Sequence, residues 1–343
     1  MFAYVGCYTT PDRRGKGQGI TVYRVDAPGA PWQHVQSLVT YDNPSFLRLS
    51  PDRTTLVAVH GGRSAVSAYA IDWTSGELAL LGQADTKGRN PVDFCFTADG
   101  KHILAAHYSS GSVSLLPMRP TGLPGDAIQT IEIAGQTGPR GADQPAPLPH
   151  GVTPDPTGRF LLVPDKGLDV VLVYTVEQGV LREVSRAATT PGAGPRHAVF
   201  HPRLPVLYAV CELDCSVQVF DWADGTLTHR ARVAGMRVET PGALAAEIAI
   251  SADGRFLYSS NRGDDSIARF AVAADGGITL LETTKLPGSE PRFFAIDPAG
   301  RHLHVAQQHS DSIVCFDLID GALAAPRVVA ETPTPVAIAF FGV

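Results

Sequence analysis

The feature that most constrains the fold of this 343-residue chain is an internal repeat that recurs six times. Each copy opens on a short apolar strand, followed by an Asp/Pro/Gly turn, a β-branched and aromatic strand, a polar loop, a third alternating strand, and an Asp-Gly turn before a fourth strand. Four strands in every ~40–50 residues are typical of a β-propeller blade. The copies begin at Pro44, Pro91, Pro149, Pro195, Ala245 and Pro291.

The two ends of the chain supply the pieces of one further blade. Residues 2–39 hold three short strands, and residues 335–340 hold one apolar strand. Pairing of these strands would close a ring and remove open sheet edges. The sequence therefore predicts an all-β fold, a seven-bladed β-propeller over residues 1–343 as a single domain, with four antiparallel strands per blade and one blade shared by the N- and C-terminal strands. A series of sandwich domains is the alternative, but it does not explain why the end strands add up to one blade.

One interval between copies is longer than the others. It holds a Pro/Gly-rich segment over residues 119–148, which we expect to be a loop. The sequence shows no long helix and no linker that would divide the chain.

Composition and charge limit the partners that such a ring can have. A net charge of -6 and a pI near 6.0 argue against a nucleic-acid surface. No apolar run approaches the ~18 residues of a membrane span, and the N-terminus lacks the pattern of a secretory signal. Five scattered cysteines imply no disulfide framework. We expect a cytoplasmic monomer or small homo-oligomer that binds neither nucleic acid nor membrane.

Blade geometry places two sets of residues at one mouth of the central channel. The first strand of each blade lies innermost and the second runs antiparallel to it, so the start of the first and the end of the second meet at one face. The first strands begin with Ser45, Val92, His150, Arg196, Ala246, Arg292 and Val336, and then Phe46, Asp93, Gly151, His197, Glu247, Phe293 and Ala337. The second strands end with His60, His107, Asp165, Cys211, Asn261 and Gln307, and then Gly61, Tyr108, Lys166, Glu212, Arg262 and Gln308.

The charged members of these sets predict a catalytic site for an anion. Charges beside a low-dielectric channel are normally paired or used, and arginine forks suit carboxylate or phosphate. Glu212 and His150 are best placed to move a proton. The predicted catalytic residues are His150, Arg196, Glu212 and Arg262, and the predicted substrate-binding residues are His107, Lys166, His197, Asn261 and Arg292. The alternative for any one residue is that its charge only anchors the channel end, and Lys166 and Arg292 fit that alternative better.

At these same residues the sequence resembles the lactonase family of seven-bladed propellers, which includes propeller-type 6-phosphogluconolactonases and carboxy-cis,cis-muconate cyclases. The resemblance covers essentially the whole chain. Gly-Pro-Arg-His at residues 194–197 and Ser-Asn-Arg-Gly at residues 260–263 carry it most specifically. Other matching stretches are residues 4–9, 19–20, 43–47, 155–160, 200–202, 212–213, 246–248, 253–258, 291–293 and 310–313.

The resemblance implies an active site of one His, two Arg and one Glu, as in the muconate cyclase branch. These match His150, Arg196, Arg262 and Glu212, the set reached from blade geometry. The chain also departs from the family where Asn usually ends the second strand and where an apolar residue is common. The departing residues are His60, His107, Cys211, Gln307 and Lys166. They line the predicted mouth and leave the substrate open.

The function that the sequence favours is hydrolysis of a small anionic sugar lactone, with 6-phosphogluconolactone first, needing no cofactor and no metal. Arg196 and Arg262 would hold the anion and the developing oxyanion. Glu212 or His150 would take the proton of the attacking water and return it to the leaving alkoxide, with the two roles left open.

Three other functions compete with this reading. The first is carboxy-cis,cis-muconate cyclisation. The second is a non-catalytic ligand- or protein-binding propeller, although the Gly-His and Trp-Asp signature of interaction propellers is absent. The third is a metal-dependent lactonase with Asp93, Glu247 and Asn261 around an axial ion.

Overall fold

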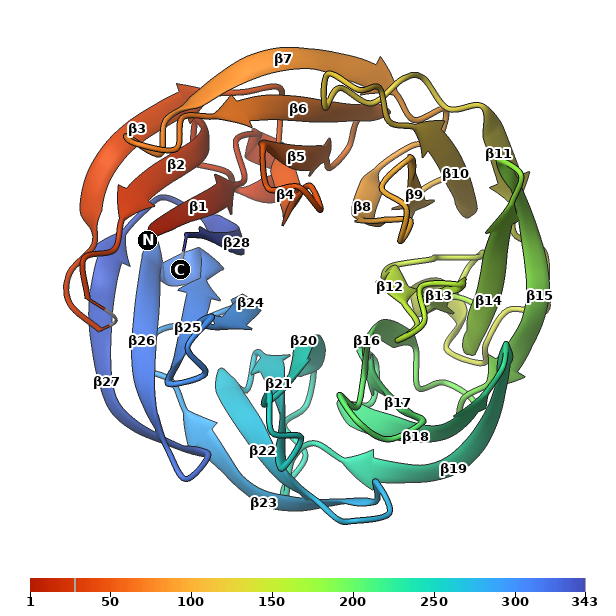
Figure 1. Cartoon of the computed structure of the whole chain (residues 1–343). Coiled ribbons are helices and arrows are strands. Elements are labelled where there is room, and N and C mark those ends of the chain that lie inside the picture. Colours follow the sequence, from red (N-terminus) through yellow and green to blue (C-terminus); the bar gives the residue numbers. More distant parts are fainter. Residues whose placement is uncertain (28, 343) are drawn as a thin grey trace.

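Seven four-stranded antiparallel sheets surround a central channel in the computed structural model, which describes residues 1–27 and 29–342 (Figure 1). Blade 1 consists of β28, β1, β2 and β3, and blades 2 to 7 follow in chain order from β4 to β27. The predicted seven-bladed propeller, with one blade shared by the two ends of the chain, is therefore confirmed.

The first and second strands of each blade line the channel side of the ring. From blade 1 to blade 7 the first strands are β28 (Pro335–Phe341), β4 (Pro44–Leu49), β8 (Pro91–Phe96), β12 (Thr153–Pro154), β16 (Pro195–Phe200), β20 (Leu244–Ile250) and β24 (Pro291–Ile296). The second strands are β1 (Phe2–Cys7), β5 (Thr55–His60), β9 (His102–His107), β13 (Phe160–Asp165), β17 (Val206–Cys211), β21 (Phe256–Arg262) and β25 (His302–Gln307).

The third and fourth strands form the outer part of each blade. The third strands are β2 (Gly19–Arg24), β6 (Ala65–Ile71), β10 (Ser112–Pro117), β14 (Val170–Glu177), β18 (Ser216–Ala223), β22 (Ser266–Val272) and β26 (Ser312–Ile319). The fourth strands are β3 (Gln33–Val39), β7 (Leu78–Asp85), β11 (Gln129–Glu132), β15 (Val180–Ala188), β19 (Thr226–Ala234), β23 (Ile278–Lys285) and β27 (Ala322–Glu331). Three short 3-10 helices are η1 (Pro11–Arg13), η2 (Gly141–Asp143) and η3 (Gln308–Ser310).

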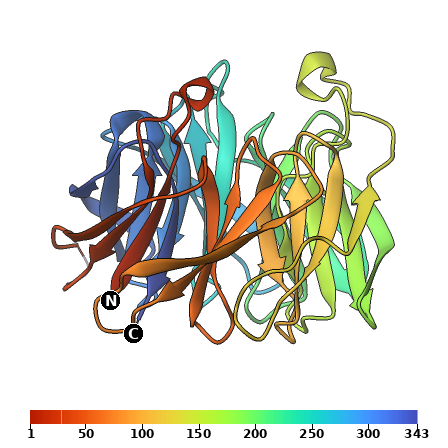
Figure 2. The same ribbon diagram turned by 90° about the horizontal axis from the view of Figure 1, so that it is seen from above.

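The ring closes through backbone pairing of β1 with β28. Phe2 pairs with Phe341, and Gly6 pairs with Ala337. Figure 2 shows both termini at one face of the ring, whereas the loops that carry η1 and η2 rise from the other face. Because β1 is a second strand, its C-terminal end lies at the face of η1, which is the mouth that the sequence predicts.

The hydrophobic core lies between neighbouring blades, because each sheet packs both of its faces. Every residue of β5, β13 and β17 is buried. Between blades 5 and 6, Val217 and Tyr208 pack in one cluster with Leu257 and Phe270. A strand buried on both faces needs continuous apolar sequence, which explains the β-branched and aromatic second strands of the repeats.

A β-bulge interrupts the first strand of most blades at its mouth end. In blade 5, Pro195 pairs with Cys211 and His197 pairs with Val210, so Arg196 between them has no partner. Equivalent breaks leave Ser45, Val92, Ala246, Arg292 and Val336 unpaired. A bulge redirects a side chain from the regular alternation of a strand. This one turns the first-strand position of each repeat toward the channel.

The expectation of a loop over residues 119–148 was wrong in part. It contains β11, which completes blade 3 by pairing with residues 112–115 of β10, and it contains η2. A strand of four residues between Pro and Gly segments leaves too short a pattern to recognise in sequence.

The sequence predicts neither a disulfide framework nor a membrane span. All five cysteines are free and buried. Among the described residues, no helix has the length and apolar character needed to cross a bilayer.

Candidate active site

Glu212 lies at the centre of a buried charge cluster, directly after β17. Its backbone N–H donates to Gly194 O at 2.7 Å. Lys166 Nζ lies 2.8 Å from Glu212 Oε1, while Arg196 Nε and Arg262 Nη2 each lie 3.3 Å from Oε2. Burial raises the pKa of this carboxyl, but Arg262, Arg196 and Lys166 outweigh burial and lower the pKa to about 2. Glu212 is therefore an ionised carboxylate with cations on both oxygens.

His150 adjoins this cluster through Arg196. Arg196 Nη1 lies 2.9 Å from the ring nitrogens of His150 and 3.4 Å from His197 Nε2. The rings of Tyr108 and His197 pack edge-on against His150, with centroids 5.6 and 5.2 Å away. Burial holds the pKa of His150 well below 6.5, and the neighbouring cations, Arg196 foremost, add to the effect. His150 is consequently a neutral imidazole at pH 7.

The two guanidiniums on Glu212 are also held by other groups. Arg262 Nη2 donates to Ala245 O at 3.1 Å, and Arg262 Nη1 lies 3.5 Å from Glu290 Oε1. Burial lowers the pKa of Arg196 to about 9, which leaves it charged at neutral pH. Both forks are therefore fixed before any ligand arrives.

Lys166 and His197 support this cluster from either side. Lys166 Nζ donates to Tyr108 Oη at 3.2 Å in addition to its contact with Glu212. His197 Nδ1 lies 3.0 Å from Glu247. The two residues thus anchor the carboxylate and the Arg196 side of the mouth.

A narrow cavity with an accessible volume of only about 20 Å³ lies on the channel axis beside the cluster. Residues at the start of the first strand of six blades line this cavity, because the bulges turn these side chains toward the channel. Its lining residues are Tyr8, Ser45, Phe46, Val92, His150, Arg196, His197, Arg292, Phe293 and Val336. The structure thus brings His150, Arg196, His197 and Arg292 to one space, with Glu212, Lys166 and Arg262 packed beside it.

The whole chain matches a known family. Residues 2–340 match the family described as "Lactonase, 7-bladed beta-propeller". The chain belongs to this lactonase family. A 6-phosphogluconolactonase of Bacillus subtilis is 29% identical over 98% of this chain and 97% of its own length. One from Formosa agariphila is 30% identical over 91% of each chain.

A solved structure extends the comparison to three dimensions. The periplasmic gluconolactonase of Pseudomonas aeruginosa is 31% identical to this lactonase-family chain. The two superpose with a TM-score of 0.89, and the alignment covers 99% of each chain.

Two predicted substrate-binding residues lie outside both the cavity and the charge cluster beside it in this family member. His107 is fully buried, with Nδ1 3.3 Å from Ser112 O, and burial lowers its pKa to about 4. Asn261 is fully buried and donates to Gly235 O at 3.3 Å. Each is the last residue of its second strand that pairs with the third strand of the same blade, His107 with Ser112 and Asn261 with Ser266. The side chain of each also contacts that partner residue. Because alternate residues of a strand face opposite ways, the residue that follows each of them faces the mouth instead.

Tyr8 is the cavity residue that the sequence analysis missed. It follows Cys7, the last residue of β1, just as Tyr108, Lys166 and Glu212 follow their second strands. The same register count, continued into the shared blade, would have found it. Burial raises the pKa of the Tyr8 phenol, but Arg292, Arg13, Arg196 and Arg262 outweigh burial and hold the pKa below 10.

The residues proposed for a metal are otherwise engaged. Asp93 lies 3.1 Å from Arg48 and accepts from the Val152 N–H at 2.8 Å. Glu247 contacts His197. Within residues 1–27 and 29–342, no group of three or more His, Cys, Asp or Glu side chains is arranged to hold a metal ion.

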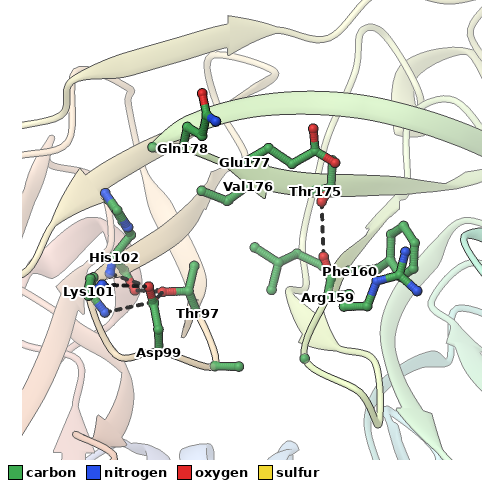
Figure 3. A pocket seen from close by; sticks show the side chains of 14 residues that line it. Thr97, Asp99, Lys101, His102, Arg159, Phe160, Thr175, Val176, Glu177 and Gln178 are labelled. Carbon is green, nitrogen blue, oxygen red and sulfur yellow. Dashed lines mark hydrogen bonds and ion pairs between the residues drawn. The ribbon is translucent and has the colours of Figure 1, made fainter.

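A wider groove lies between blades 3 and 4, at the turns that join their first and second strands and at the turn from β14 to β15 (Figure 3). These turns are at the face opposite the mouth. The groove's charged side chains form exposed local pairs, such as Lys101 with Asp99 at 3.8 Å and Arg159 with Asp224 at 2.7 Å. Exposed pairs of this kind carry little energy, so the buried cluster at the mouth is the better candidate for chemistry.

Proposed function

We propose that this protein hydrolyses a small anionic sugar lactone, with 6-phosphogluconolactone as the favoured substrate. The observation that carries the proposal is the buried cluster of Glu212, Lys166, Arg196 and Arg262 beside a neutral His150. The names of the Bacillus and Formosa relatives support the same reaction class.

Arg196 and Arg262 supply the positive charge for the transition state. Water attacks the lactone carbonyl, and negative charge develops on the carbonyl oxygen. Guanidinium donors already fixed by Glu212 need little rearrangement to stabilise that charge, and one such donor is typically worth roughly 10²–10³ in rate. Arg196 lines the cavity, so its N–H groups are the closer to a bound lactone.

His150 is the group that we assign to proton transfer. Both oxygens of Glu212 are occupied by cations, and its pKa of about 2 makes it a weak base. His150 is neutral at pH 7 and lines the cavity. It takes a proton from the attacking water and returns it to the ring oxygen as the carbon–oxygen bond of the lactone breaks, a contribution of roughly 10²–10⁴. No cofactor takes part in these steps.

Glu212 then acts as a positioning residue for the cations. Without its carboxylate, Lys166 and Arg196 would lose their partner and Arg262 would keep only Glu290, which is costly in a buried site. This role explains why one acid at the mouth contacts groups from blades 4, 5 and 6.

Loss of freshly prepared 6-phosphogluconolactone, followed through acid release, tests the proposal. We expect the wild-type chain to accelerate hydrolysis, and His150→Gln and Glu212→Gln to lower kcat by about 10²-fold or more. Glu183→Gln removes a carboxylate that pairs with Arg186 on the outer strand β15, so it is the matched control. Circular dichroism shows whether each variant retains its strands. A wild-type rate equal to spontaneous hydrolysis would exclude the function.

The cytoplasm remains the compartment that we propose. Five free, buried thiols suit a reducing compartment, although the Pseudomonas relative is named periplasmic. We also propose one domain, active as a monomer or small homo-oligomer, since the cluster at the mouth is built from a single chain.

A further inference from the structure

Two arginines converge on the Tyr8 ring at the edge of the central cavity. The Cζ atom of Arg292 lies 5.4 Å from the ring centre, and that of Arg13 lies 5.3 Å away. Arg13 Nη1 also lies 3.5 Å from the Tyr8 hydroxyl. Tyr8 and Arg292 line the same cavity as His150 and Arg196.

The charge balance here differs from that at Glu212. Arg196 and Arg262 share a buried carboxylate, whereas no carboxylate within the described part of the chain lies within 4 Å of Arg292. Glu290 pairs directly with Arg262, while Glu212 and Glu290 act on Arg292 from a longer distance. For Arg13, the one carboxylate within 4 Å in the described ranges is that of the exposed Asp12, at 3.8 Å. Two guanidinium groups that lie against the Tyr8 ring beside a buried cavity indicate a binding site for an anion.

The Tyr8 backbone and the Arg13 side chain are held by hydrogen bonds within the protein before any ligand binds. Tyr8 N donates to Thr334 O at 3.1 Å, and Tyr8 O accepts from Gly17 N at 2.9 Å. Arg13 Nη2 donates to Asn90 Oδ1 at 3.1 Å. A preorganised set of donors loses little entropy when it binds a ligand.

We propose that Tyr8, Arg13 and Arg292 form a subsite for a phosphate monoester carried by the substrate away from its lactone carbonyl. This inference rests on the proposed hydrolysis at His150 and Arg196. A phosphate dianion offers oxygens to two guanidinium forks and one phenol hydroxyl at once. The subsite then gives the cavity two ends, one for the reacting carbonyl and one for the phosphate.

The competing explanation is that the arginines only pack on the ring as cation–π contacts. Packing would support the fold and affect every substrate alike. A phosphate subsite instead changes the preference between a phosphorylated lactone and its unphosphorylated counterpart.

The test compares kcat/KM for 6-phosphogluconolactone with kcat/KM for glucono-δ-lactone. We expect Arg292→Met to lower the ratio of the two values by about 10- to 100-fold, the usual range for a charge-assisted contact. Arg13→Gln, at a partly exposed side chain, should lower the same ratio. Arg292→Lys keeps the charge without the fork and should give an intermediate ratio. An unchanged ratio, or an equal loss for both lactones, overturns the subsite.

Arg63→Met is the matched control for loss of a positive charge at this face. Arg63 is an exposed arginine at the rim that pairs with Asp42, so its removal should leave the ratio unchanged. A fall in the ratio as large as that of Arg292→Met would assign the effect to long-range attraction and overturn the subsite.

A binding experiment separates this proposal from the proposed function. If the wild-type chain hydrolyses neither lactone, calorimetric titration with 6-phosphogluconate and with gluconate still tests the subsite. Tighter binding of 6-phosphogluconate that Arg292→Met abolishes supports the subsite. Equal binding of the two acids to the wild-type chain, or tighter binding of 6-phosphogluconate that persists in Arg292→Met, overturns the subsite.

Discussion

At the scale of single residues, the site depends on how many cations share one carboxylate. Glu212 contacts Lys166, Arg196 and Arg262, which come from three different blades. An ion cluster of this kind is not assembled for stability, because desolvation consumes most of the Coulomb gain. It fixes positive charge at a chosen place instead, which fits a site for an anion.

Lys166→Met tests the electrostatic role of the shortest of these contacts. The Lys166 ammonium, 2.8 Å from Glu212 Oε1, lowers the pKa of both Glu212 and His150. Its removal therefore raises both pKa values. Whichever group must be unprotonated for catalysis, the acid limb of the kcat/KM profile should move to higher pH by about one unit. Lys101→Met, at an exposed lysine on the opposite face, should leave the limb in place. A limb that stays fixed or moves to lower pH would contradict this account.

The sequence predicted the members of this cluster but not their pairing. Register counting placed Glu212, Arg196 and Arg262 at one mouth, and the family resemblance selected the same residues. It did not show that Lys166 would occupy Glu212 Oε1, nor that Arg292 would remain without a carboxylate. These pairings depend on how far side chains extend from one blade to the next, and the repeat pattern does not specify that distance.

At the scale of strands, two devices repeat around the ring. The first-strand bulge turns one residue per blade into the channel, and its presence is not visible in the repeat itself. The second device is a tyrosine on the second strand that donates to a turn carbonyl of the next blade. Examples are Tyr4 to Gly76 O, Tyr208 to Gly276 O and Tyr258 to Gly321 O, at 3.1, 2.8 and 2.8 Å.

Tyr208→Phe removes one of these contacts between blades. The ring stays buried, so the loss should be that of one hydrogen bond to a backbone carbonyl, about 1–2 kcal/mol of unfolding free energy. Urea denaturation measures this change. Tyr41→Phe removes the hydroxyl of an exposed ring and should change stability by less than about 0.5 kcal/mol. A loss at Tyr208 no greater than the loss at Tyr41 would show that the contact does not hold the blades together.

Strand alternation also explains why two of the predicted site residues do not line the cavity. His107 and Asn261 were chosen because they end second strands, but the residue that faces the channel is the next one along. His60 shows the same placement, with Nε2 2.8 Å from Ser67 Oγ on the neighbouring third strand. An error of one residue in register changes the face completely, so site prediction from repeats depends on register more than on residue type.

At the scale of the whole molecule, the ring was predictable because each blade repeats the same pattern and the chain ends complement each other. Closure through β1 and β28 relies on backbone pairing and on packing between blades, with side-chain contacts such as Thr334 Oγ1 to Tyr8 O at 2.8 Å. The stability of the ring thus depends on how well the blades pack, and polar side chains buried between the apolar sheets affect that packing. His60, His107 and His304 are fully buried in blades 2, 3 and 7.

These three histidines should make the ring unstable in mild acid. Burial lowers the pKa of each from 6.5 to about 4. Between pH 6.5 and 4 the unfolded chain binds protons that the folded ring does not, so the unfolding free energy falls as pH falls. Each histidine contributes up to about 3 kcal/mol. Burial raises the pKa of Asp165 to about 6, so the folded ring binds a proton there that the unfolded chain does not. This effect increases the unfolding free energy as pH falls, but it offsets the contribution of only about one of the three histidines. Depressed carboxylates such as Glu212 add their loss only below about pH 4.5.

Urea denaturation at pH 7.5, 6 and 5 measures this slope, and His304→Phe isolates one part of it. Among residues 1–27 and 29–342, neither ring nitrogen of His304 has a hydrogen-bond partner, and the ring packs against Trp32 and Phe340. An aromatic ring without titration therefore suits the site. The variant should lose less unfolding free energy between pH 7.5 and 5 than the wild type. His34→Phe replaces an exposed imidazole on β3 and should retain the wild-type slope. A wild-type chain equally stable at pH 7.5 and 5 would mean that the buried imidazoles gain protons without unfolding, through water that reaches the blades from outside.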